Sequence, residues 1–181
     1  MFRPLSFVFA TVVLTTVAAA GPVSAVPLAQ LRDALKQRYP LSRIEVQSRP
    51  NEGAVIERGA ILTLEADGVP AKRLRIIQAN TKSPRFHVHD YARIEIAEGG
   101  VLRAGQGDFT LAKGTRLVVL DLKVEAGGVR LFTHTTEPVA LPGGGSAYGC
   151  AEFVFRFGGT PERPDLARVE QVIEHWLPFA G

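Results

Sequence analysis

Two segments of the chain repeat apolar residues at intervals of three and four, which is the period of an α-helix with one buried face. Near the N-terminus the repeated positions are Leu28, Leu31, Leu35 and Tyr39, and Pro40 ends the pattern. Near the C-terminus they are Leu166, Val169, Ile173, Trp176 and Leu177, and Pro164 suits the first turn. The pattern therefore predicts a short helix at each end of the chain, each with an apolar stripe that needs a surface to cover.

Between these helices the apolar residues recur at every second position, which is the period of a β-strand. In the clearest case, Val118, Leu120, Leu122 and Val124 alternate with Val119, Asp121 and Lys123, and Gly127-Gly128 permits a tight turn. A later segment places Ala151, Phe153, Phe155 and Phe157 on one face. We expect a mainly β fold of roughly six to eight antiparallel strands, in a small barrel or two packed sheets, with a short N-terminal helix and a C-terminal amphipathic helix.

The first 25 residues have the build of a secretory signal peptide. Arg3 precedes an apolar stretch from Leu5 to Ala20, and small residues lead up to Ala25. We expect cleavage after Ala25 and a periplasmic or secreted product that has no membrane span. The remainder divides into an N-terminal helix and first strand (residues 26–50), an antiparallel β domain (51–158) and a C-terminal helix packed on it (159–181).

The charged residues are interspersed, with 21 basic and 18 acidic side chains and no run of five like charges. This pattern argues against a nucleic-acid partner, because such a partner is bound by clustered positive charge. Cys150 is the only cysteine, so no internal disulfide can form. We expect it to be a small residue of a strand; a reactive thiol or an intermolecular disulfide is the alternative.

The stretch FHVHDYARIEI, residues 86–96, carries the candidate metal chemistry. On one strand, His87, His89, Tyr91, Arg93 and Glu95 share a face, whereas Phe86, Val88, Ala92, Ile94 and Ile96 form the core face. Two imidazoles at alternate positions can bind one divalent transition metal, with His134 and Glu95 as further ligands. We expect His134, like Arg130 and Phe132, to lie off the core face. The simpler interpretation is polar-face histidines and no cofactor, and a pH-responsive role is a third.

The sequence contains no recognisable catalytic set. It lacks a G-x-S-x-G elbow, and GGGSAYG, residues 143–149, lacks the lysine of a phosphate-binding loop. Because glycine is costly to order, we expect residues 138–149 to form a mobile loop at one end of the barrel. Tyr148 at its base is either an exposed contact or packed on the core. The candidate binding residues are Tyr148, Tyr91 and Arg93.

The chain carries, in this order, the segments RYPLSRIEVQ, GAVIERGAILTLEADGVPAK, LAKGTRLVVLDLKVEAGGVRLFTHT, AYGCAEFVFRF and PDLARVEQVIEHWL. This order resembles a family of exported bacterial β-rich proteins with no assigned activity, over most of residues 39–177. The resemblance implies a compact module with an SH3-like barrel, and it carries over no catalytic residue. The leading hypothesis is an exported, non-enzymatic β-module that binds a protein or a cell-envelope component. The alternative is a small metal-binding protein or metal-dependent enzyme that uses His87, His89 and His134.

Overall fold

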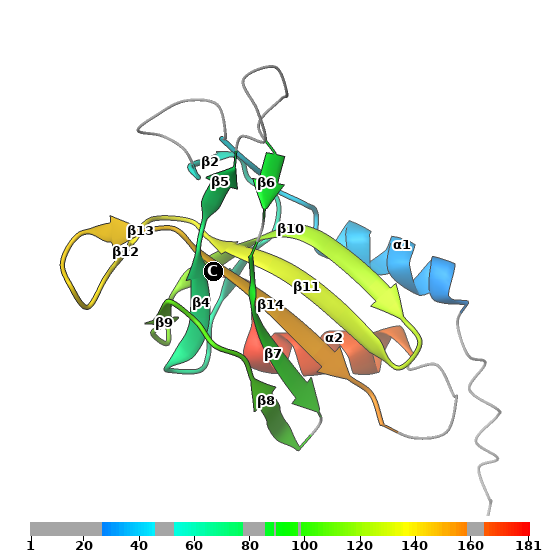
Figure 1. Ribbon diagram of the computed structural model, residues 1–181. Coiled ribbons are helices and arrows are strands. Elements are labelled where there is room, and N and C mark those ends of the chain that lie inside the picture. The colour runs from blue at the N-terminus through cyan, green and yellow to red at the C-terminus, as the bar shows by residue number, and fades with distance from the viewer. Residues whose placement is uncertain (1–26, 46–52, 78–85, 89, 98, 159–164) are drawn as a thin grey trace, which may run out of the picture.

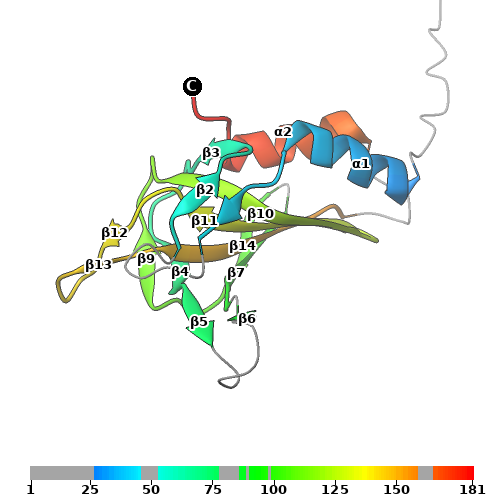
Figure 2. The ribbon, with the colours of Figure 1, turned by 90° about the horizontal axis from the view of Figure 1, so that it is seen from above.

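The computed structural model describes residues 27–45, 53–77, 86–88, 90–97, 99–158 and 165–181. The expected signal peptide, residues 1–25, lies outside these ranges. Within them one large sheet curls into a half-barrel, and two helices lie side by side against one of its faces (Figures 1 and 2). The predicted mainly β fold with a helix near each end is confirmed.

The helices are α1 (Leu28–Arg38) and α2 (Leu166–Trp176). The strands in the described ranges are β1 (Arg43–Ile44), β2 (Val55–Glu57), β3 (Ile61–Thr63), β4 (Val69–Arg73), β5 (Arg75–Ile77), β6 (Phe86–Val88), β7 (Ala92–Ala97), β8 (Gly100–Ala104), β9 (Phe109–Leu111), β10 (Arg116–Glu125), β11 (Gly128–Thr135), β12 (Val139–Ala140), β13 (Ser146–Ala147) and β14 (Gly149–Arg156).

The large sheet has the strand order β3-β10-β11-β14-β4-β9, and β7 with β8 branches from β14. Most of its pairs are antiparallel, as predicted, but β7 runs parallel to β14 from Ala92↔Ala151 to Ala97↔Arg156. A parallel pair needs a long connection, and here the chain passes through β8 to β13 between the two strands. The pairs β1-β2, β5-β6 and β12-β13 form separate two-stranded sheets.

Both helices begin and end where the local sequence favours it. The α1 segment LAQLRDALKQR is rich in helix-forming residues, and Lys36 and Arg38 place positive charge at its C-terminal end, where the helix dipole is negative. At the start of α2 the Asp165 side chain accepts a hydrogen bond from the Arg168 backbone N–H at 2.7 Å. This cap satisfies one of the backbone donors that a helix leaves free at its N-terminus.

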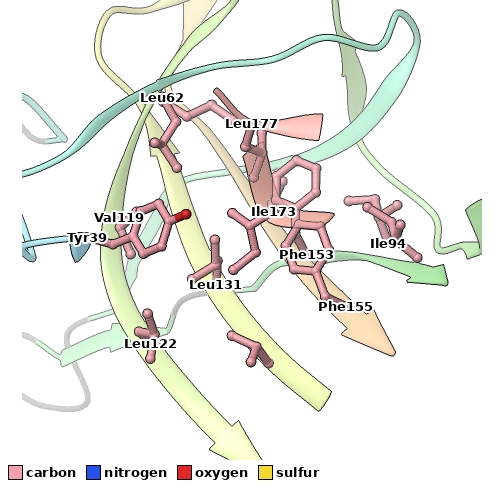
Figure 3. Close-up of a cluster of buried hydrophobic side chains, with 14 of the residues drawn as sticks. Tyr39, Leu62, Ile94, Val119, Leu122, Leu131, Phe153, Phe155, Ile173 and Leu177 are labelled. Atoms are coloured by element: carbon pink, nitrogen blue, oxygen red, sulfur yellow. The ribbon is translucent and has the colours of Figure 1, made fainter. Parts of the chain in front are cut away.

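The core lies between the helices and the concave face of the half-barrel (Figures 2 and 3). From the helices, the predicted stripes supply Leu31, Leu35, Tyr39, Val169, Ile173 and Leu177, each fully buried. From the sheet come Leu62, Ile94, Val119, Leu131, Phe153 and Phe155, among others. Leu166 and Trp176 are partly buried against the same cluster, whereas Leu28 is half-buried and lies outside it. The other predicted core positions of the helices and those of β14 are confirmed.

The β10-β11 hairpin forms as predicted, with Gly127 at a φ of 79° in its turn. Its face assignment was wrong in part, because a bulge between Val119 and Asp121 shifts the register. The alternation therefore changes phase at Leu120: Val119 and Leu122 both join the main core cluster, whereas Val118 is buried outside that cluster. A run of four apolar residues gives no sign of where such a shift falls.

The stretch 86–96 is two strands rather than one. β6 pairs with β5 in a small sheet of its own, whereas β7 belongs to the large sheet. The alternation predicted for β7 is confirmed, since Ala92, Ile94 and Ile96 are buried and Arg93 is exposed. His87 lies on β6, where only the backbone is described, and His89 lies outside the described residues.

The glycine-rich segment after β11 is a hairpin. β12 and β13 pair through Val139↔Ala147 and Ala140↔Ser146, and the hairpin projects from one end of the sheet (Figure 1). Gly144 and Gly145 turn the chain with φ values of 87° and 79°. The segment expected to be an irregular loop therefore has its own short ladder.

Candidate functional site

The candidate site is the face of β10, β11, β14 and β7 turned away from the helices, here called the outer face. Side chains of alternate residues lie on it in rows set by the strand register. One row runs Asp121, Phe132, Glu152 and Arg93, and the next runs Lys123, Arg130, Val154, Glu95 and Arg103. Residues in register lie about 5 Å apart on one face, so each row brings charged and aromatic groups into contact.

The centre of the outer face is a carboxylate held by two arginines. Glu152 has a side chain only 5% exposed, yet it carries a charge. Arg93 Nε donates to Glu152 Oε2 at 2.8 Å, and Arg130 Nε donates to Glu152 Oε1 at 2.5 Å. Burying a lone carboxylate is expensive, and the opposite charges on both of its oxygens offset that cost. The interaction therefore fixes both guanidinium groups in place.

Arg130 is held from a second side as well. Its Nη1 donates to Glu125 Oε1 at 2.9 Å, and this hydrogen bond, followed by that of Glu152, raises the pKa of the guanidinium. Arg93 has a side chain 51% exposed, compared with 22% for Arg130. Arg93 is thus the member of the cluster that is both positioned by Glu152 and open to a partner.

Two aromatic rings lie beside this ion-pair cluster. Tyr91 meets Phe132 edge to face, with ring centroids 5.1 Å apart and planes at 72°. The Lys123 ammonium lies 5.0 Å, and the Arg130 guanidinium 5.3 Å, from the Phe132 centroid, within the range of cation–π attraction. Burial raises the pKa of the Tyr91 phenol, so this ring stays neutral. Aromatic and cationic side chains therefore form one continuous patch.

A small polar hollow adjoins the patch at the edge of the sheet. It has a volume of about 210 Å³ and is lined by Arg93, Glu95, Arg103 and Gly105. Arg156 Nη2 lies 3.4 Å from Glu95 Oε1, so the carboxylate in the hollow is itself paired. The hollow therefore extends the charged part of the outer face as far as β8.

His134 lies on the predicted side of β11, since Leu131 joins the core and His134 does not. It is nevertheless fully buried. Its Nδ1 lies 2.6 Å from the Thr135 carbonyl oxygen, and its ring packs against Tyr148 with centroids 5.0 Å apart. Tyr148 is half-buried, and its role as a binding contact stays a prediction.

The structure does not bring His134 and Glu95 together. His134 is in register with Cys150 on β14, whereas Glu95 is in register with Val154. Four strand residues separate these partners, which is about 13 Å along the sheet and too far to share one ion. Among the described residues, no three His, Cys, Asp or Glu side chains gather as a metal site. The contribution of His87 and His89 stays a prediction.

Cys150 is the buried strand residue that the sequence predicted. Burial, followed by the charge of Asp90, raises the pKa of its thiol to about 12. A thiol with so high a pKa has almost no thiolate at neutral pH, and the thiolate is the nucleophile.

Sequence reasoning singled out Tyr91 and Arg93 but missed Glu152, Phe132 and Arg130 as parts of the same site. The available signal was the alternation of β14, which places Glu152 opposite the phenylalanine face. Its partners come from β7 and β11, and the parallel pairing that brings Arg93 beside it leaves no local trace in the sequence.

No family model, curated protein or solved structure matches this chain. Neither helix in the described ranges has the length and apolar character needed to cross a bilayer. The function must therefore be inferred from the residues of the chain itself.

Proposed function

We propose that this chain is an exported, non-enzymatic binding module that holds a protein partner on the outer face of its sheet. The observation that carries the proposal is the buried Glu152 carboxylate, whose two oxygens hold Arg93 and Arg130 beside the Tyr91–Phe132 ring pair. Protein interfaces are enriched in aromatic residues and arginine at their centres. The outer face presents both types in one patch.

The fixed geometry of the patch favours binding. A long side chain that is ordered only on association costs roughly 0.5–1.5 kcal/mol of binding free energy. Arg93 and Arg130 are already held by Glu152, and Lys123 is held over Phe132. A partner with a carboxylate for Arg93 and an apolar group for the rings would pay little of this cost.

Export is supported by the sequence of residues 1–25, in which one basic residue, an apolar stretch and small residues succeed one another. Expression of the full chain in a Gram-negative host, followed by cell fractionation, tests this part of the proposal. The expected result is a periplasmic or secreted protein whose N-terminal sequence begins at Val26. A cytoplasmic product that retains Met1 would contradict it.

The binding role is tested with a photo-crosslinking amino acid placed at Arg103, at the rim of the patch, and in parallel at Arg32 on α1. Both positions are exposed, but α1 lies on the opposite side of the sheet. The proposal expects a discrete crosslinked protein from Arg103 only. For the partner so identified, Arg93→Gln should weaken binding at least tenfold, whereas Arg32→Gln should not. Because Arg93 also offsets the buried charge of Glu152, Arg93→Gln should lower the melting temperature as well, so binding is measured at a temperature at which every variant is folded. Equal crosslinking at both positions, or undiminished binding by Arg93→Gln, would refute the proposal. Tyr148→Ala then tests whether the patch extends to Tyr148.

A further inference from the structure

A second site lies on the helix side of the molecule, between α2 and the end of β7. There a hollow of about 450 Å³ is lined by Ala97, Arg168, Gln171, Val172, His175 and Trp176. The five α2 residues follow one another at intervals of three and one, so they share one face of the helix. Small-molecule sites in proteins have volumes of roughly 300–1,000 Å³, so this hollow has room for a small ligand.

One of the residues that line the hollow, Trp176, has an aromatic ring packed against the core. Trp176 is half-buried and packs against the core cluster, as does Val172. His175 meets the indole at right angles, with ring centroids 5.6 Å apart. The indole is therefore held by the core on one side while it lines the hollow, so little ordering is needed when a ligand packs on it.

Polar side chains also line the hollow. Gln171 and His175 are exposed, and the amide and the imidazole each offer both a donor and an acceptor. Glu174 of α2 pairs with Arg38 of α1 at 2.8 Å, and the described residues that line the hollow include no carboxylate. These residues combine an indole with hydrogen-bonding side chains.

These groups select a class of ligand. A purely apolar ligand would cover Gln171 and His175 without replacing their hydrogen bonds to water, which costs binding free energy. A sugar ring suits both kinds of lining residue, because its C–H face packs on an indole by dispersion and its hydroxyl groups exchange hydrogen bonds with amide and imidazole.

We infer that the hollow beside Trp176 binds the pyranose ring of a sugar. This site is separate from the outer face, because α2 covers the opposite side of the sheet (Figure 2). The inference does not depend on the proposed protein partner, and either can fail without the other.

The test uses the fact that Trp176 is the only tryptophan of the chain, so its emission reports on this hollow alone. The mature protein is titrated with glucose, N-acetylglucosamine or glucuronate, and free N-acetyltryptophanamide corrects for optical effects. The expected result is a saturable change in emission with at least one sugar, at a Kd of roughly 1 mM or below. Saturation-transfer NMR on the same sugar provides a second, independent measurement.

Two matched variants locate the binding. Gln171→Ala should weaken binding at least tenfold, whereas Gln30→Ala, at an exposed position on α1, should leave it unchanged. Arg93→Gln on the outer face should also leave it unchanged. The inference is overturned if no sugar produces a saturable change in emission at concentrations up to roughly 100 mM. Such concentrations lie far above the millimolar Kd that we expect. It is equally overturned if the Gln171→Ala and Gln30→Ala variants bind alike.

Discussion

The ring of Tyr39, just after α1, stacks on the ring of Phe179 at the C-terminus, with centroids 5.3 Å apart and planes 3° from parallel. The Arg38 guanidinium covers Phe179 at 4.6 Å and also pairs with Glu174 of α2. The backbone of Phe179 forms an isolated antiparallel β-bridge with Leu62, and the backbone N–H of Ala180 donates to the Ile61 carbonyl oxygen at 2.9 Å. The C-terminal residues thus cover the edge of β3 and connect it to both helices.

The first prediction concerns this contact. Phe179 is 37% exposed, so its removal should forfeit the stacking and part of the burial without opening the core. We expect Phe179→Ala to lower the free energy of unfolding by about 1–2 kcal/mol. Urea denaturation followed by Trp176 fluorescence measures the change. Leu41→Ala, which truncates a side chain of the same 37% exposure, is the control for simple loss of apolar surface. If the two variants have the same midpoint, the stack contributes nothing of its own.

The second prediction concerns alkaline pH. Burial raises the pKa of the phenols of Tyr39 and Tyr91 above the usual value near 10. The folded chain keeps these protons while the unfolded chain releases them. The associated stability is therefore fully present below pH 10 and is lost as the pH rises beyond it. We expect a melting temperature that falls above pH 10, and a smaller fall in Tyr39→Phe. An identical alkaline dependence in the variant and the wild type would show that Tyr39 titrates freely.

The third prediction concerns Cys150, whose thiol pKa of about 12 and complete burial should protect it from alkylation. At pH 8 the thiolate fraction is about one in ten thousand, so a thiol reagent should label the native chain only through transient opening. In denaturant, labelling should reach one equivalent within minutes. Rapid labelling of the native chain would mean that the outer face opens near β14.

The fourth prediction separates the two acids that hold Arg130. Glu152 is buried, whereas the Glu125 side chain is 45% exposed. Removing a buried charge leaves its partners uncompensated, so Glu152→Ala should cost about 2–4 kcal/mol of folding free energy. Glu125→Ala breaks an exposed pair and should cost less than about 1 kcal/mol. Thermal unfolding of both variants checks the order. Equal costs would mean that water reaches Glu152 and that the arginines are not held by it.

The predictable part of the fold is the part governed by local periodicity. The stripes of α1 and α2 and the phenylalanines of β14 are each set by neighbouring residues on one face, so the sequence shows them directly. The bulge at Leu120 is different, because Leu117 to Leu120 are all apolar and any phase of the alternation buries some of them. Tertiary pairing, rather than local preference, decides that register.

The candidate site was less predictable than the fold for the same reason. Arg93 and Glu152 are 59 residues apart and meet only because β7 pairs in parallel with β14. The alternation of β11 predicts that His134 lies off the core face, but it does not predict that the Tyr148 ring packs against it. A two-residue period tells which face a side chain takes, but it does not tell what covers that face.

The last prediction concerns the tip of the β12-β13 hairpin, where three glycines follow one another. A Cβ added at Gly143, Gly144 or Gly145 would meet no atom within 4 Å. Lack of room for a side chain is therefore not the reason why these three residues are glycines. Gly144 and Gly145 have positive φ values, which cost an alanine roughly 1–2 kcal/mol, whereas Gly143 does not. Gly143→Ala should therefore be neutral or slightly stabilising, because it reduces the entropy of the unfolded chain. Gly144→Ala should strain the turn. Amide exchange of Val139 and Ala147, which face each other in a hydrogen-bonded pair, should accelerate in Gly144→Ala only, since the strain is confined to a projecting hairpin that can open without the core. A shorter two-residue turn in place of residues 143–145 should leave the melting temperature almost unchanged, because exposed loops tolerate changes in length. A large loss of stability in the shortened hairpin would instead show that its conformation supports Tyr148, and through it the buried His134.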